Sequence, residues 1–235
     1  MVSLKVVTGY IPLPKHPRTA EEYGKLGEEM FSQLRVPIHP FYEDIEDCWL
    51  TRYLRKHQIH PNISVGDNPE KNTLSYHIVQ HQKFEWLCKA AMYDPRPDVL
   101  VWMDYGIGHV PGVTPAVVRE FLDKVVKWDL AIPGCWKEGD PRIETVGEDS
   151  PNWRFCGGLM TVPRNQLIPL YKRVRQAVGI KLSLKHHVTW EVNTLADVEQ
   201  FLPIRWYEAD HDASMFTEYA SEAGKVVKPS GLILP

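Results

Sequence analysis

The sequence predicts a single α/β domain with a mostly parallel central sheet and helices on both faces. Two observations indicate this class: candidate strands alternate with candidate helices, and one strand, Val99–Met103 (VLVWM), is continuously apolar. Continuous apolarity is typical of a central strand that is covered on both faces. A chain of 235 residues, of which 43% are hydrophobic, is long enough for one domain with a large core.

The other strands are expected at short apolar and β-branched runs between turn signals. The expected strands cover residues 4–10, 36–42, 99–103, 129–133, 157–162 and 204–207. Pro37 and Pro40 limit the pairing of the second strand, because proline has no amide hydrogen to donate.

Helices are expected where apolar residues recur at helical spacing between capping signals. The expected helices cover residues 19–34, 47–57, 74–93, 114–127, 164–178 and 187–200. Thr19 and Glu22 predict a capping box, and Thr114 predicts an N-cap followed by Pro115 at the first helical position. Segments 59–72 and 134–153 are rich in Pro, Gly and charged or polar residues and are expected to be loops. The tail from Lys225 has no assignment.

Composition narrows the classes of partner. The net charge is −3 and the pI is about 6.4, so there is no strong nucleic-acid footprint, although Lys15, His16 and Arg18 form a local basic cluster that can bind phosphate. No apolar run of about 18 residues and no signal-peptide layout occur, so we expect no membrane span and a cytoplasmic protein, in a bacterial cell or a virus-infected host. The four cysteines form no CxxC pair, and no short Cys/His ladder predicts structural zinc, so we expect four reduced, buried thiols.

Polar residues follow three of the expected strands. In open α/β sheets, ligands bind outside the carboxyl ends of the strands, so we expect these residues to converge around one ligand. The alternative is that each residue only caps a strand or starts a turn. They are Thr8, Gly9 and Tyr10 at the end of the first strand, Glu43 and Asp44 after the second, and Asp104 after the central strand.

Segment 98–110, DVLVWMDYGIGHV, resembles the part of GT-A glycosyltransferases that carries a metal-binding acidic motif at the end of a buried strand. That motif is Asp-x-Asp in most such families, whereas here it is Asp104-Tyr105-Gly106 and the second acid is missing. WMDYGI is more closely similar to a segment of the HtrL/YibB-like bacterial and viral proteins, a group related to glycosyltransferases. The resemblance spans roughly residues 4–216 and leaves 217–235 as a tail.

The resemblance implies a GT-A-like, Rossmann-like fold and a hexosyl- or pentosyltransferase that uses a nucleotide-sugar donor. It implies that a Mn²⁺ or Mg²⁺ ion, held by Asp104 and His211, neutralises the departing diphosphate. A metal-independent variant would use Lys83, Lys15 or Arg18 on the diphosphate. The acceptor is a glycan, a protein or a modified nucleic-acid base. The expected donor-binding residues are Thr8, Gly9, Tyr10, Asp44, Lys83, Asp104, Tyr105 and Gly106, and the expected acceptor-binding residues are Trp153, Gly157 and Gly158.

Glu191 and Asp197 are the candidate catalytic acids. On a helix over 187–200, His187 and Glu191 would share one face, and Asn193 and Asp197 another. Glu191 would then accept the proton of the acceptor hydroxyl, as an inverting transferase requires, and Asp197 is the next candidate base. The alternative is that Glu191 is an ordinary solvated helix acid.

Two other functions stay open at the level of sequence. A metal-dependent phosphoester or nucleotide hydrolase would require a denser carboxylate cluster than Asp104 alone provides. A catalytically silent nucleotide-sugar-binding module is consistent with the missing second acid. Catalytic zinc at His186 and His187 is disfavoured, because HHxxxE differs from the HExxH spacing. GxGxxG and P-loop motifs are absent.

Overall fold

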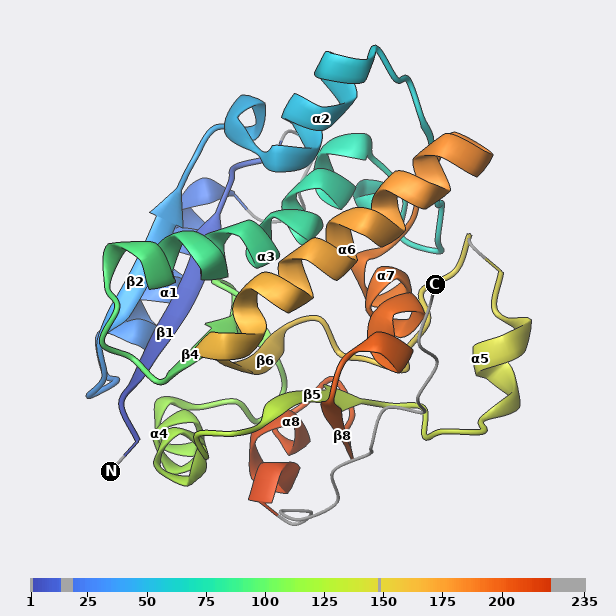
Figure 1. Ribbon diagram of the computed structural model, residues 1–235. Helices are drawn as coiled ribbons and strands as arrows, with labels where there is room; N and C mark the ends of the chain where they lie inside the picture. Colours follow the sequence, from blue (N-terminus) through green and yellow to red (C-terminus); the bar gives the residue numbers. More distant parts are fainter. Residues whose placement is uncertain (1, 14–18, 148, 221–235) are drawn as a thin grey trace.

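The computed structural model describes residues 2–13, 19–147 and 149–220 (Figure 1). Its central sheet has the strand order β2-β1-β4-β6-β5-β8, and every neighbouring pair is parallel except those made by β6, which is antiparallel to β4 and to β5. The predicted mostly parallel sheet is therefore confirmed. Its strands are β1 (Leu4–Tyr10), β2 (Ile38–Tyr42), β4 (Val99–Met103), β5 (Leu130–Gly134), β6 (Leu159–Pro163) and β8 (Ile204–Glu208).

Helices cover both faces of the sheet, as predicted. One core joins a sheet face to α2, α3, α6 and α7, and a second core joins the other face to α1, α4 and α8. In Figure 1, α3 and α6 lie side by side across the first face. The helices are α1 (Ala20–Phe31), α2 (Trp49–His57), α3 (Leu74–Tyr93), α4 (Pro115–Lys124), α5 (Pro141–Thr145), α6 (Arg164–Lys185), α7 (Glu191–Val198) and α8 (Ser214–Thr217). Short 3-10 turns are η1 (Ile45–Asp47), η2 (Pro69–Lys71), η3 (Ile107–His109), η4 (Glu199–Phe201) and η5 (Glu218–Ala220).

Strand β4 explains why the run VLVWM is apolar at every position. Its side chains alternate between the two cores: Leu100 and Trp102 pack under α3 and α6, whereas Val101 packs on the opposite face. All five residues of the strand are buried. The strand therefore lies in the middle of the molecule, and the residue that follows it is delivered to the edge of the sheet.

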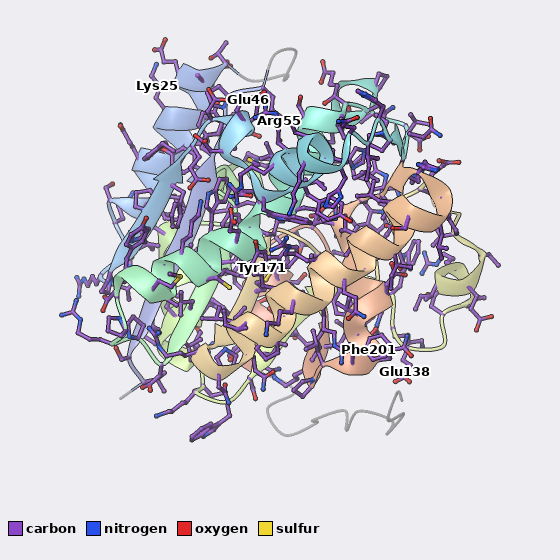
Figure 2. All side chains as sticks on the ribbon, turned by 45° about the horizontal axis from the view of Figure 1, so that its top comes forward. Lys25, Glu46, Arg55, Glu138, Tyr171 and Phe201 are labelled. Atoms are coloured by element: carbon purple, nitrogen blue, oxygen red, sulfur yellow. The ribbon has the colours of Figure 1, made fainter. Side chains whose placement is uncertain are left out.

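Local capping signals form as the sequence predicts. The amide of Glu22 donates to Thr19 Oγ1 (3.2 Å), and the Thr19 amide donates to Glu22 Oε2 (2.7 Å), which completes the capping box of α1. Thr114 caps α4, and Pro115 occupies its first position. Tyr171, labelled in Figure 2, lies on α6 and donates its hydroxyl hydrogen to Glu85 Oε1 on α3 (3.1 Å), which connects the two helices.

The expected helix over 187–200 is wrong at its beginning. Helix α6 continues past residue 178 and stops at His186, whose backbone is left-handed (φ 49°). His187–Val188 then forms strand β7, which pairs in parallel with β3 (Asn62–Ile63). The amide of Asn62 donates to His186 O (2.8 Å), so pairing with a distant segment replaces the helical turn. Because α7 begins only at Glu191, His187 and Glu191 share no helix face.

The two expected loops hold more structure than predicted. Segment 59–72 contains β3 and η2, and segment 134–153 contains α5, which Asp140 caps by accepting a hydrogen bond from the Arg142 amide (3.0 Å). The cluster of Lys15, His16 and Arg18 and the tail from Lys225 lie outside the described residues. Within residues 2–13, 19–147 and 149–220, no helix is both long enough and apolar enough to cross a membrane.

Candidate active site

A cavity of about 690 Å³ lies at the edge of the sheet where β1 and β4 end. Because β6 is antiparallel, its first residues reach the same edge, and α3 and α7 supply further side chains. The position agrees with the expected ligand site of an open α/β sheet. The residues predicted from the sequence that line the cavity are Gly9, Tyr10, Lys83, Asp104, Tyr105, Gly106, Trp153, Gly157, Gly158, Glu191 and His211.

Three predicted residues do not reach this cavity. Thr8 is fully buried within β1 and is not one of the residues that line the cavity. Asp44 caps η1 by accepting a hydrogen bond from the Glu46 amide (3.1 Å). Asp197 pairs with Lys181 on α6 (Oδ2 to Nζ, 2.7 Å) and borders a separate hollow between α5, α6 and α7. The contacts of Asp44 and Asp197 therefore give structural explanations for two acids that the sequence placed in the site.

Lys83 is the centre of the cavity's polar wall. It projects from α3, and its side chain is only 1% exposed. Its Nζ donates to the carbonyl of Gly157 (2.8 Å) and to Glu191 Oε1 (3.2 Å), and it lies 3.7 Å from Asp104 Oδ1. A buried ammonium group thus stands between two carboxylates that come from β4 and α7. We refer to Lys83, Asp104 and Glu191 as the charged triad.

Lys83 and Glu191 each stabilise the charged form of the other. Burial lowers the pKa of Lys83, but the neighbouring Asp104 and Glu191 carboxylates outweigh it, so that the pKa is raised overall. Burial likewise raises the pKa of Glu191, but Lys83 and, more weakly, His81 outweigh it, so that this pKa is lowered overall. Both groups are therefore charged at neutral pH, which a buried carboxylate achieves only with a partner.

Asp104 directly follows β4, and hydrogen bonds of both its side chain and its backbone fix its position. The indole of Trp102 donates to Asp104 Oδ1 (2.8 Å), and the Asp104 amide donates to the carbonyl of Gly158 (3.0 Å). The Asp104 side chain is 38% exposed, more than the other two members of the triad. It is the carboxylate that a ligand in the cavity can reach most easily.

Of the two glycines before β6, Gly157 is the one that allows the triad to form. A Cβ at Gly157 would lie 2.1 Å from Glu191 Oε1, and a Cβ at Gly158 would lie 3.5 Å from Asp104 Oδ2. Gly157 therefore permits the loop backbone to approach the carboxylate closely enough to accept a hydrogen bond from Lys83. The predicted Gly-Gly element thus serves the triad as well as the cavity wall.

The missing second acid has a packing explanation. A Cβ at Gly106 would lie 2.5 Å from the ring of Tyr23, so a larger side chain does not fit there. Instead, Tyr10 stacks between Tyr23 and Tyr105, with ring centroids 5.2 and 5.5 Å apart. Tyr10, Tyr23 and Tyr105 thus form an aromatic wall in this part of the cavity.

Several lining residues were not singled out from the sequence. Tyr76 and Gln80 extend from α3 on the same side as Lys83, and Gln80 Oε1 accepts a hydrogen bond from Lys83 Nζ (3.2 Å). Trp190 makes an edge-to-face contact with Tyr76 (5.7 Å between centroids). The spacing 76, 80, 83 was the available signal, because it places polar groups on one stripe of a long and mainly buried helix.

His211 lies on the rim of the cavity beside two thiols. Its ring meets Trp153 edge to face (4.4 Å between centroids), and its Nδ1 is 3.7 Å from Cys135 Sγ. The pKa of Cys135 is lowered to about 6, mainly by the hydrogen bond with the Cys156 thiol, whose Sγ is 3.6 Å from Cys135 Sγ. Burial opposes this shift, and His211 adds to it. The hydrogen bond with Cys135, together with burial, raises the pKa of Cys156.

Comparisons with known proteins identify similar solved structures but no family. No family model matches the chain, and no curated protein matches it. One similar structure is a glycosyltransferase involved in the glycosylation of the major capsid of PBCV-1, with 13% identity, 88% of this chain and 81% of that chain covered, and a TM-score of 0.47. Another is mouse xyloside xylosyltransferase 1 in its apo form, with 12% identity, 89% and 86% covered, and a TM-score of 0.42.

Proposed function

We propose that this protein is a GT-A-type glycosyltransferase that transfers a sugar from a nucleoside-diphosphate sugar to an acceptor hydroxyl. The observation that carries the proposal is the charged triad of Lys83, Asp104 and Glu191 in the wall of a 690 Å³ cavity at the carboxyl edge of the sheet. A cavity of this size is suited to a ligand as large as a nucleotide sugar. The transfer needs a group that offsets the leaving diphosphate and a base near the acceptor, and the triad offers candidates for both.

The aromatic wall supports a donor site next to Asp104. Tyr10, stacked with Tyr23 and Tyr105, lines the cavity together with its two neighbours. Flat rings of this kind bind a nucleobase by stacking. The diphosphate would then extend from this wall toward Asp104.

The charge of the triad supports assistance by Mn²⁺ or Mg²⁺. One ammonium and two carboxylates leave a net charge of −1, which repels a diphosphate, whereas a divalent cation at Asp104 changes this sum to +1. Such ions are commonly held by one or two carboxylates, with phosphate and water in the remaining positions, so a single Asp fits them. When bound, the ion would neutralise the leaving diphosphate. Asp104 would hold it, and His211 is the second ligand that the family resemblance suggests.

Glu191 is our candidate base. Its lowered pKa keeps the carboxylate ionised, and the contact with Lys83 fixes Oε1 beside Gly157. In the transfer, the acceptor oxygen forms a bond to the anomeric carbon as the bond from that carbon to the diphosphate oxygen breaks. The hydroxyl proton of the acceptor passes to Glu191. Trp153, which also lines the cavity, offers a ring on which the acceptor sugar can stack.

Two isosteric variants test these roles. Asp104→Asn removes the charge at the donor side and is expected to weaken both donor binding and turnover. Glu191→Gln is expected to leave donor binding nearly unchanged and to lower transfer by about a hundredfold or more, the usual effect of losing a general base. Donor affinity is measured by calorimetric titration across a panel of nucleotide sugars with and without Mn²⁺, and turnover by release of the nucleoside diphosphate.

The same measurements distinguish the other functions. A hydrolase would release nucleotide at full rate without any acceptor, and a silent binding module would bind the donor but release nothing. Full transfer by Glu191→Gln would reduce Glu191 to a structural partner of Lys83. Unchanged binding and turnover in Asp104→Asn would remove the main support for glycosyl transfer.

A further inference from the structure

Three side chains with soft metal-binding atoms meet at the rim of the cavity, apart from the charged triad. Cys135 Sγ lies 3.6 Å from Cys156 Sγ and 3.7 Å from His211 Nδ1, and all three atoms lie within 4.8 Å of one another. Cys135 follows β5, Cys156 precedes β6 and His211 follows β8. Because β6 is antiparallel, these three segments reach the same edge of the sheet.

Two of the three separations between the ligand atoms agree with the edges of a zinc coordination sphere, and the third, between Cys156 and His211, is within 4.8 Å. With Zn–S of about 2.3 Å, Zn–N of about 2.05 Å and tetrahedral angles, two sulfurs are about 3.8 Å apart, and a sulfur and a nitrogen about 3.6 Å. The observed separations of 3.6 and 3.7 Å differ from these values by about 0.2 Å or less. A disulfide, in contrast, would require the two sulfurs to approach to about 2.05 Å.

Backbone hydrogen bonds hold the three segments in place without a ligand. The Cys135 amide donates to Trp153 O (2.9 Å), the Cys156 amide donates to Pro133 O (2.7 Å), and the amide after β8, at Ala209, donates to Gly134 O (2.9 Å). The two cysteines are therefore positioned by the sheet edge itself. His211 is exposed, and its ring contacts both Trp153 and Cys135 Sγ.

We propose that Cys135, Cys156 and His211 bind a zinc ion. Thiolate and imidazole ligands favour Zn²⁺ over Mg²⁺ or Mn²⁺, which prefer oxygen. The described residues supply three ligands, so the fourth position belongs to water or to a group bound in the cavity. The ion would connect the segments after β5 and β8 to the Gly157 loop. This assignment places His211 in the zinc site and leaves the Mn²⁺ or Mg²⁺ ion to Asp104, so it replaces the role that the family resemblance suggests for His211. Zinc binding itself does not require the proposed glycosyl transfer.

Cobalt substitution tests the site on the full-length, untagged protein. After removal of metal by a chelator under reducing conditions, Co²⁺ is expected to bind with one equivalent per chain and to produce thiolate-to-cobalt absorption in the near ultraviolet, which Zn²⁺ then abolishes. Competition with a chromophoric chelator gives the zinc affinity. Because ligands must lose their protons, the affinity is expected to fall as the pH is lowered.

Two variants and one control locate the ion. Cys135→Ser and His211→Ala each remove one ligand from the partly exposed side, and each is expected to weaken zinc binding by more than about a hundredfold, since even loss of an outer-shell partner costs 10- to 100-fold. Cys88→Ser removes a buried thiol outside the cluster and is expected to bind zinc like the parent. Circular dichroism confirms that each variant is folded.

Three results would overturn the proposal. The first is the absence of thiolate-to-cobalt absorption in the parent chain. The second is unchanged zinc affinity in both Cys135→Ser and His211→Ala, which would place the ion elsewhere. The third is a Cys135–Cys156 disulfide that mass spectrometry detects under the reducing conditions of the titration, which would make the pair a redox site.

Discussion

The charged triad makes a direct prediction about folding stability. In Lys83→Met the ammonium is lost, and the Glu191 carboxylate remains buried with its side chain only 7% exposed. Leaving one member of a buried ion pair without its partner typically costs about 3–5 kcal/mol of unfolding free energy. Asp104 adds less to this cost, because its side chain is 38% exposed and keeps contact with water. With a urea dependence of about 2 kcal/mol per M, the unfolding midpoint should fall by about 2 M.

The dependence on pH checks the cause of this loss. In the parent chain the folded pKa of Glu191 is lowered, so its stabilising contribution is present at neutral pH and is lost as the pH falls through that pKa. Without Lys83, burial is expected to raise the folded pKa above the unfolded value, so the penalty is present at neutral pH and recedes as the pH falls. The difference in stability between parent and variant should therefore narrow between pH 7 and pH 5.

A second variant and a control complete the measurement. Lys83→Met combined with Glu191→Gln removes both buried charges and should recover most of the lost stability, because a buried pair replaced as a whole is often nearly neutral. Lys25→Met removes an exposed ammonium that pairs with Glu21, and little change is expected (Figure 2). An unchanged midpoint in Lys83→Met, or no recovery in the double variant, would show that Lys83 does not stabilise the buried Glu191 carboxylate.

Two further predictions concern packing and thiol chemistry. Gly9→Ala places a Cβ 2.4 Å from the ring of Trp86 and should lower the free energy of unfolding by about 1–3 kcal/mol. Gly24→Ala lies in α1 with no atom within 4 Å of the added Cβ and should raise the free energy of unfolding by about 0.5–1 kcal/mol. Urea unfolding of both variants measures the difference. The pKa of the Cys135 thiol is lowered to about 6, so in metal-free protein its rate of reaction with iodoacetamide should rise through pH 6 and then level off. Burial raises the pKa of Cys88 to about 12, so this thiol should stay unmodified in the folded chain. Mass spectrometry after timed alkylation measures both thiols, and a midpoint for Cys135 near the ordinary value of 9.0 would contradict the geometry.

Elements with strong local signals were predictable from the sequence. The ranges expected for β1, α3 and β4 coincide with the structure at both ends. In each, the signal is contained within the element: an apolar run for β4, and for α3 a periodic stretch that stops before Asp94-Pro95. Neighbouring residues decide such elements, so no knowledge of the fold is required.

Elements that depend on distant partners were not predictable in the same way. Strand β7 forms because His187 and Val188 meet Asn62 and Ile63, more than a hundred residues earlier in the chain. The segment 187–200 has helical spacing, but strand pairing takes its first two residues, and the helix begins only at Glu191. The reversed direction of β6 likewise has no signature within its own five residues.

The residues of the candidate site likewise fall into those with a local sequence signal and those that depend on contacts with distant parts of the chain. Asp104 could be identified from the sequence because it follows an apolar strand. Glu191 and Asp197 could not be told apart from the sequence, but in the structure Glu191 is buried beside Lys83, whereas Asp197 is more exposed beside Lys181. The contact between Lys83 and Glu191 joins residues 108 positions apart. The thiol and imidazole cluster was missed for the same reason, since its cysteines are 21 residues apart and His211 is 76 residues beyond Cys135.

The most direct test of the account is a paired titration and turnover measurement on the parent chain and Asp104→Asn. With Mn²⁺ present, we expect that at least one nucleoside-diphosphate sugar binds the parent, that nucleoside diphosphate is released faster when an acceptor is supplied, and that Asp104→Asn weakens both effects. No binding of any nucleotide sugar, with or without Mn²⁺, by a parent chain that is folded by circular dichroism would contradict the assignment of this cavity to glycosyl transfer.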